Sequence, residues 1–170
     1  MKLGKGLLAL SVAMALACAF LPAVPMGFAE NAVQAEADYG GVVWRYAAKH
    51  EEGDLEPSEF CYVTFNDEVL LMRWNSPYDP QSIGVYAVRG KNGNVIEANI
   101  IDYYELDENH NFARAGYDKD ETVTVAVNGQ AIMVHAKRPG FENKLQFNRT
   151  EAKVSGYFPE HFIRKYLPAF

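Results

Sequence analysis

Cysteine is nearly absent from this chain of 170 residues, which contains only Cys18 and Cys61. Cys18 lies in an apolar N-terminal segment, so a chain that has lost this segment keeps Cys61 alone. One cysteine excludes an intramolecular disulfide, and the fold must therefore be stabilised by a packed core. We predict that Cys61 is a small buried side chain in a strand rather than a reactive thiol.

Long hydrophobic runs are missing after the N-terminal segment. A membrane-spanning helix needs roughly 18 predominantly apolar residues, and no stretch beyond residue 29 provides them. The segment itself has the layout of a secretory signal peptide, with Lys2 and Lys5 ahead of an apolar run and small residues ending at Ala29. We therefore predict a signal peptide at 1–29, a flexible mature N-terminus at 30–39, and a secreted, periplasmic or envelope protein without a membrane span.

Other ways of processing this segment stay open. Cleavage after Ala35 or Ala37 also satisfies the small-residue rule. Residues 15–18 resemble a lipobox, in which Cys18 would be lipidated. This alternative is less favoured because Leu16 is one position out of place and the apolar run continues after the cysteine.

Positive charge is scarce. Removal of the first 29 residues takes away Lys2 and Lys5 and no acid, so that 14 Lys and Arg remain against 22 Asp and Glu, and the formal charge changes from −6 to −8. Nucleic acids and anionic lipids are bound by clustered Lys and Arg. We therefore expect no nucleic-acid partner.

Catalytic and metal-binding motifs are missing as well. There is no Gly-x-Ser-x-Gly elbow and no phosphate-binding loop, and the four histidines are not spaced as zinc ligands are. Residues 107–111 begin like a calcium loop, but Phe112 stands where such a loop needs glycine, and we predict a polar turn. The expectation is a protein without metal, cofactor or enzymatic activity.

What is present is a strand pattern. Apolar residues alternate over 122–127 and 131–136 around Asn128-Gly129, a strong hairpin signal. A two-residue loop there would pair Val125 with Ile132. Around Asn92-Gly93 a three-residue loop with a bulge, Gly93 being left-handed, would pair Val88 with Ile96. Further strands are predicted at 41–49, 60–65, 69–74, 95–106, 112–117 and 144–149.

About eight sequential antiparallel strands favour closure into a barrel, because closure removes the exposed sheet edges. We therefore predict an all-β fold, an up-and-down or half-open barrel, in one domain at 40–170. After the strands, Pro159 and the spacing of Phe162, Ile163 and Tyr166 predict a short helix at about 159–167. A helix this short should dock on the barrel, either outside it or across one mouth.

The chain resembles small bacterial lipocalin-like, or calycin-like, domains. The resemblance is carried by Gly40-Gly41-x-x-Trp44 at the first strand, Tyr86-x-Val88-x-Gly90 in a hairpin, and Leu145-x-Phe147-x-Arg149 in the closing strand. The family's opening signature is Gly-x-Trp, and this chain has one residue more. The resemblance implies that Trp44 packs on the barrel floor with Arg149 across it.

The resemblance also implies a small apolar or amphipathic ligand in the barrel, or loops that contact another protein. The candidate interior residues are Tyr62, Leu71, Tyr86, Ile100, Val125, Ile132 and Phe147, which are equally explained as the filling of a narrow barrel. The alternative is an envelope or surface protein-interaction domain that uses the loop at 74–82. A third hypothesis, a hydrolase or isomerase, would use Tyr104, His110 and His135 at the barrel mouth.

Overall fold

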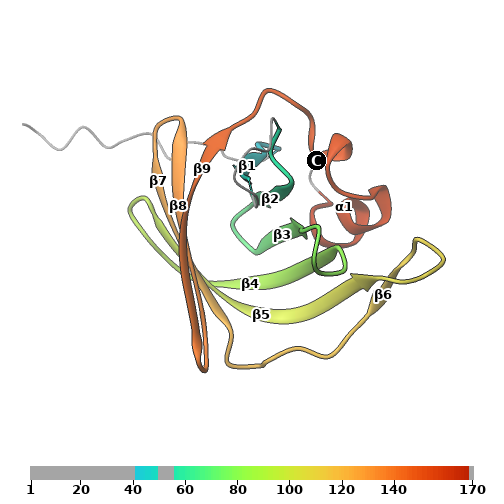
Figure 1. Ribbon diagram of the computed structural model, residues 1–170. Coiled ribbons are helices and arrows are strands. Elements are labelled where there is room, and N and C mark those ends of the chain that lie inside the picture. The colour runs from blue at the N-terminus through green and yellow to red at the C-terminus, as the bar shows by residue number, and fades with distance from the viewer. Residues whose placement is uncertain (1–40, 50–55, 169–170) are drawn as a thin grey trace, which may run out of the picture. The chain divides into compact units, whose positions relative to one another are not determined.

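The computed structural model describes residues 41–49 and 56–168. The predictions for 1–29, 30–39 and Gly40 lie outside these residues. Eight antiparallel strands close into a barrel, one further strand lies beside it, and a short helix follows (Figure 1). The predicted all-β barrel with a C-terminal helix is confirmed.

The order of the strands around the barrel is β4-β3-β2-β1-β9-β8-β7-β5, and pairing of β4 with β5 closes the ring. The strands are β1 (Trp44–Ala48), β2 (Glu59–Phe65), β3 (Val69–Asn75), β4 (Ser82–Asn92), β5 (Val95–Leu106), β6 (Phe112–Arg114), β7 (Thr122–Asn128), β8 (Ala131–Arg138) and β9 (Phe141–Arg149). The backbone groups of the ring strands therefore find partners on both sides.

The strand predicted at 112–117 is shorter than expected and is not part of the ring. Only Phe112–Arg114 is extended, and this β6 pairs with the last residues of β5 alone. The first half of the long β5 pairs instead with β7. Because β5 has 12 residues, it can pair along one edge first with β7 and then, at its end, with β6.

The hairpin between β7 and β8 has a register two residues away from the predicted one. Gly129, with φ of 60°, opens the two-residue loop, and Asn128 is the last paired residue before it. Val125 therefore faces Val134 and not Ile132. Glycine with positive φ at the first loop position is what a type II′ turn requires, whereas our prediction placed both Asn and Gly in the loop.

The hairpin between β4 and β5 differs from the prediction in the same direction. Gly93 has the expected positive φ, 59°, but Val88 faces Ala98 and not Ile96. The irregularity lies within the strand, between Val88 and Gly90. A shift of two residues keeps each side chain on its face of the sheet, so the hydrophobic pattern cannot distinguish the two registers.

Two hydrophobic cores lie on the two faces of the barrel wall. The inner core contains the inward side chains of the ring, among them fully buried Trp44, Cys61 and Phe147. The outer core lies between the wall and the C-terminal segment and contains Val43, Leu71, Ile83, Val85, Val154, Phe158, Phe162, Ile163 and Leu167. The predicted burial of Cys61 in a strand is confirmed.

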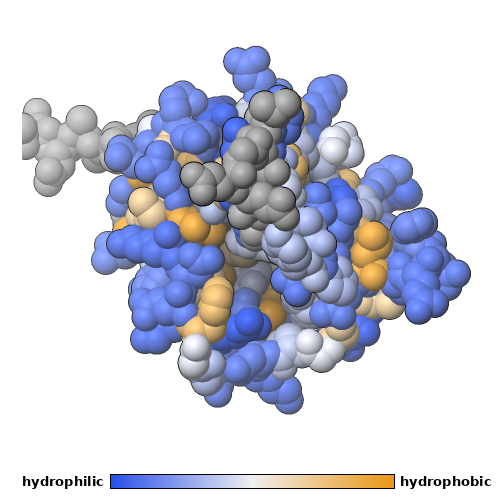
Figure 2. Space-filling view, in the orientation of Figure 1, coloured by the Kyte–Doolittle hydropathy of each residue, from blue (hydrophilic) through white to orange (hydrophobic). Residues whose placement is uncertain are grey.

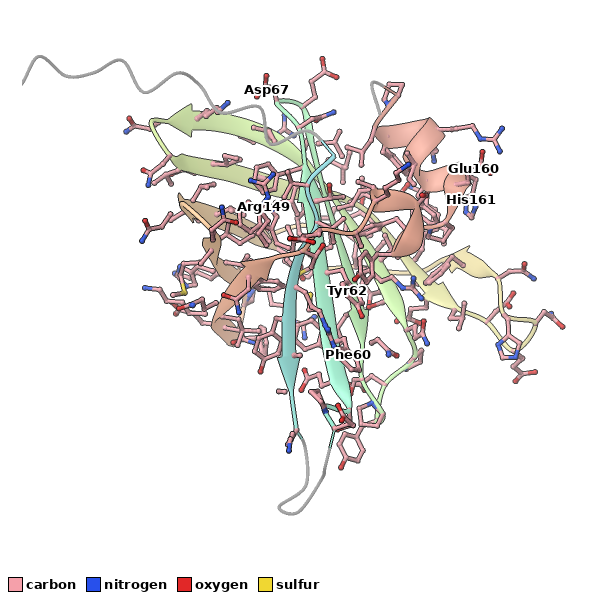
Figure 3. All side chains as sticks on the ribbon, turned by 90° about the horizontal axis from the view of Figure 1, so that it is seen from above. Phe60, Tyr62, Asp67, Arg149, Glu160 and His161 are labelled. Carbon is pink, nitrogen blue, oxygen red and sulfur yellow. The ribbon has the colours of Figure 1, made fainter. Side chains whose placement is uncertain are left out.

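The C-terminal helix docks on the outside of the barrel. A single 3-10 turn, η1 (Val154–Gly156), precedes α1 (Glu160–Tyr166), which begins directly after Pro159. Figure 3 shows Glu160 and His161 of α1 beside the strands rather than over either end of the barrel. The helix therefore leaves the barrel mouth uncovered.

Candidate functional site

A cavity of about 550 Å³ opens at one end of the barrel. The ends of β3, β5 and β8 and the beginnings of β2, β4 and β9 form its rim. In Figure 3, Phe60 lies near the beginning of β2 and Asp67 lies in the turn after its end, and the cavity is at the Phe60 end. The hollow is visible near the middle of the face in Figure 2, where hydrophobic and hydrophilic surfaces meet.

The opposite end of the barrel is filled with side chains. Phe65, Leu70, Ile96 and Val127 stand at the strand ends there, and each is at most 4 % exposed. Trp44 is fully buried in the same core and faces Arg149 in the neighbouring strand. The stacking of Arg149 on Trp44 that the resemblance implies stays a prediction.

Apolar and polar side chains contribute about equally to the cavity walls. The apolar part includes Met72, Trp74, Val134, Ala136, Leu145 and Phe147. Tyr46 extends this aromatic wall, since its ring lies 6.2 Å from that of Trp74 and 5.8 Å from that of Phe147. Such a wall can remove an apolar molecule from water at about 25 cal/mol for each Å² that is buried.

A polar contact at the cavity wall joins Tyr86 and Glu121. The hydroxyl of Tyr86 donates to Oε1 of Glu121 at 2.5 Å, and the Tyr86 side chain is almost wholly buried. Burial raises the pKa of Tyr86 well above its ordinary value, and the Glu121 carboxylate raises it further. The phenol therefore stays protonated at neutral pH and acts as a donor that holds the carboxylate in place.

Gly84 makes room for the ring of Tyr86. Both residues face the barrel interior from β4, and a Cβ atom on Gly84 would lie 2.7 Å from Cε2 and 2.8 Å from the hydroxyl oxygen of Tyr86. Real Cβ contacts are not this short. A residue without a side chain is therefore needed where the ring crosses the strand.

Four carboxylates and two cationic side chains complete the lining. They are Glu59, Asp79, Glu105, Glu121, Lys137 and Arg138. Nη1 of Arg138 lies 3.9 Å from Oε2 of Glu121, and its guanidinium lies 4.9 Å from the ring centre of Phe141 at the rim. The site can therefore contact an apolar body with its walls and a polar head at its mouth.

The structure places five of the seven predicted interior residues in the inner core: Tyr86, Ile100, Val125, Ile132 and Phe147. Of these, Tyr86 and Phe147 line the cavity, and the other three fill the barrel below it. Whether any of them binds a ligand stays a prediction.

Tyr62 and Leu71 are on the other face of the wall, which corrects their predicted interior position. Leu71 belongs to the outer core, and Tyr62 packs against that core with its ring 4.3 Å from that of Tyr157. Both faces of β2 and β3 are apolar because the C-terminal segment covers the outer one. Alternation of apolar residues therefore could not identify the inner face.

The three residues of the enzyme hypothesis do not meet at the barrel mouth, and none of them lines the cavity. The hydroxyl of Tyr104 lies 2.8 Å from that of Tyr166 on the outer wall, and His110 is exposed in the turn before β6. His135 contacts Glu142 at 2.5 Å and faces Thr124. The hypothesis of a barrel-mouth catalytic group with these residues is wrong in its geometry.

A second polar cluster ties α1 and β6 to the outer wall around Asp102, which is 8 % exposed. Its carboxylate accepts hydrogen bonds from Tyr104 at 2.8 Å, Tyr166 at 3.1 Å and Nε of Arg114 at 2.6 Å. Lys165 also donates to the Tyr104 hydroxyl at 3.1 Å. Because this cluster unites three elements of the fold, we interpret it as structural.

Comparison with protein-family models, with curated proteins and with solved structures finds no significant match. The closed eight-stranded barrel is compatible with a lipocalin-like fold, and the relationship itself stays a prediction. Among the residues that the structure describes, no helix has the length and apolar character needed to cross a membrane.

Sequence reasoning did not single out the cavity residues Trp74, Glu105 and Glu121 as ligand-binding. A signal was present for Glu121, which directly precedes a strongly alternating strand. It stands two positions before Val123 and so shares the inward face of that residue. For Glu105, the bulge in β5 between Ile100 and Tyr103 changes the alternation, and the sequence does not reveal it.

Proposed function

We propose that this protein is an exported, non-enzymatic binding protein that holds one small apolar or amphipathic ligand in its barrel, as lipocalin-like domains do. The observation that carries the proposal is the cavity of about 550 Å³ at one end of a closed eight-stranded barrel. Small-molecule pockets usually measure roughly 300–1,000 Å³. Export is inferred from the signal-peptide pattern at 1–29.

The distribution of polarity supports binding rather than catalysis. Aromatic and aliphatic side chains form one part of the wall, while three of the six charged side chains, Asp79, Lys137 and Arg138, are exposed at the mouth. Burial raises the pKa of both Tyr86 and Tyr103, so neither phenol is a ready proton acceptor at neutral pH. Tyr103 can orient a ligand by donating a hydrogen bond, whereas the hydroxyl hydrogen of Tyr86 is already donated to Glu121.

The test is the binding of 1-aminoanthracene, a neutral dye whose fluorescence rises in apolar surroundings, to the mature protein and to Ala136→Phe. Ala136 lines the cavity, so a phenyl ring there should fill part of it and abolish the fluorescence rise. Ala47→Phe is the matched control, because Ala47 is exposed on β1. Equal binding by the wild type and a correctly folded Ala136→Phe would contradict the proposal.

A protein-interaction role for the loop between β3 and β4 is the second candidate. Tyr78 in this loop is 65 % exposed, and the neighbouring Asp79 and Pro80 line the cavity rim. A photoreactive phenylalanine at position 78 should then crosslink to one envelope protein in intact cells, and the same residue at position 113 should not. Identical crosslinking patterns at the two positions would remove this candidate.

A further inference from the structure

We propose that the ligand of this cavity is an organic cation, an ammonium group on an aromatic or aliphatic body. This inference rests on the proposed function and names the class of ligand. Its basis is the combination of an excess of carboxylates over cations in the lining with an aromatic wall. The four carboxylates exceed Lys137 and Arg138 by two formal charges.

The carboxylates are more buried than the cationic side chains, so the excess of negative charge is felt more strongly inside the cavity. Glu59, Glu105 and Glu121 are partly buried, and the Glu121 side chain is only 16 % exposed. Lys137 and Arg138 are both exposed, Arg138 with half of its side-chain surface in solvent. Water screens the exposed cations more than the partly buried carboxylates, so the potential within the cavity is negative.

The three partly buried carboxylates reach the cavity from different parts of the wall. Glu59 begins β2, Glu105 is near the end of β5, and Glu121 directly precedes β7. Each shares its inward face with a core residue two positions away, respectively Cys61, Tyr103 and Val123. An ammonium group has N–H donors in several directions, and acceptors spread around a mouth suit it better than they suit a planar or anionic head.

The aromatic wall favours the same class of ligand. Trp74, Tyr86, Tyr103 and Phe147 all line the cavity. The negative faces of aromatic rings attract a cation by about 0.5–2 kcal/mol, and the same rings bury the apolar body of an amphipathic amine.

The inward tyrosines already respond to this field. Burial is the main cause of the raised pKa of Tyr103, and Glu105 and Glu121 raise it further. The pKa of Tyr46 is raised by burial and by Glu59. Only the carboxylate part of these shifts acts on a bound amine in the same direction and favours its protonated form, because burial by itself lowers the pKa of an amine.

A metal ion is a poorer fit than an organic cation. In the ranges 41–49 and 56–168, no three His, Cys, Asp or Glu side chains converge closely enough to hold a metal ion. The carboxylates are spread around a cavity of about 550 Å³, which matches the size of a whole organic molecule.

The experiment is isothermal titration calorimetry of the mature protein with three compounds that share an indole body. Tryptamine is a cation at neutral pH, tryptophol is neutral, and indole-3-acetate is an anion. We expect tryptamine to bind about tenfold more tightly than tryptophol, and indole-3-acetate to bind most weakly. Added salt should weaken tryptamine binding and leave tryptophol binding nearly unchanged.

Glu105→Gln should reduce the preference for tryptamine over tryptophol by several-fold, because it removes one inward charge and keeps the side-chain size. The matched control is Glu97→Gln on the same strand, where the carboxylate is exposed and lines no part of the cavity. This control should leave the preference at its wild-type value. Equal losses in the two variants would show that the preference arises from overall charge, and would overturn the assignment to the cavity.

Failure of this inference differs from failure of the proposed function. Tryptophol or indole-3-acetate binding as tightly as tryptamine would overturn the cationic ligand and leave a binding barrel. Lack of binding by all three compounds would have the same meaning if the wild type still binds 1-aminoanthracene and Ala136→Phe does not. Lack of binding by the dye as well, in a folded protein, would overturn both.

Discussion

The hydroxyl of Tyr86 on β4 donates a 2.5 Å hydrogen bond to Glu121 Oε1, across the width of the intervening strand β5. Tyr86 faces Ile100 of β5 in the sheet, and the amide of Ile100 donates to the backbone oxygen of Glu121. The side-chain contact and the backbone contact together connect three neighbouring segments and place a carboxylate at the wall of the cavity.

The hydrogen bond between Tyr86 and Glu121 should contribute to the stability of the folded protein. We expect Tyr86→Phe and Glu121→Gln each to lower the free energy of unfolding by about 1–2 kcal/mol, because each leaves a partly buried polar group with a poorer partner. The double variant should be less destabilised than the sum, with a coupling energy of about 1 kcal/mol. Urea unfolding of the four proteins measures the cycle, and additive losses would show that the two groups do not interact.

Gly84→Ala should destabilise the barrel although the added group is one methyl. The new Cβ would lie 2.7 Å from the ring of Tyr86, so the ring must move, and this movement disturbs the hydrogen bond between its hydroxyl and Glu121. We expect a loss of about 1–3 kcal/mol in thermal or urea unfolding. Gly90→Ala on the same strand is the control, because a Cβ there meets no atom within 4 Å, and its stability should stay near that of the wild type.

The stability that Asp102 supplies should disappear in acid. Burial alone would raise the pKa of Asp102, but the hydrogen bonds from Tyr104, Arg114 and Tyr166 outweigh it and hold the pKa below its ordinary value of 3.8. A depressed carboxyl pKa stabilises the folded state above the unfolded value, and the contribution is lost as pH falls through the folded one.

Asp102→Asn should therefore lower the free energy of unfolding at pH 7 by about 1–3 kcal/mol, and the difference from wild type should shrink as pH falls below 3.8. Urea unfolding at a series of pH values measures it. Asp67→Asn is the control, because Asp67 is 83 % exposed and its pair with Lys91 should contribute little. A difference for Asp102→Asn that stays constant through the acid range would contradict the linkage.

The thiol of Cys61 should react only when the barrel opens. Cys61 is fully buried in β2, and burial raises its pKa well above the ordinary thiol value. A disulfide reagent at neutral pH should label the native mature protein slowly and the urea-unfolded protein at once. Ala47→Cys should add one fast equivalent in the native state, since position 47 is exposed. Rapid labelling of native wild type would show that the inner core is accessible.

The sequence predicts the closed barrel well because its main signals are local. Alternation in β7 and β8, the Asn-Gly turns and Pro159 each act over a few residues, and all have their expected kind of structure. The β7–β8 register failed by two residues because Gly129 opens the loop. The β4–β5 register failed by two residues because Gly93 opens its loop and a bulge follows between Val88 and Gly90. The alternating pattern cannot distinguish registers that differ by two residues.

The site is harder to predict because it depends on contacts between distant segments. Tyr62 and Leu71 face outwards only because the C-terminal segment, about 90 residues later, supplies their apolar partners. The pairing of Tyr86 with Glu121 likewise spans 35 residues. The combined volumes of all the inward side chains decide which end of the barrel stays open. No local sequence pattern indicates this combined volume.

The most direct test of the binding cavity is native mass spectrometry of the mature protein purified from its own cell envelope, compared with the denatured mass of the same sample. The account predicts a non-covalent adduct that is lost on denaturation and is small enough for a cavity of about 550 Å³. The cationic-ligand inference adds that the released compound is an amine. A native mass equal to the denatured mass, together with no uptake of 1-aminoanthracene, would contradict the account.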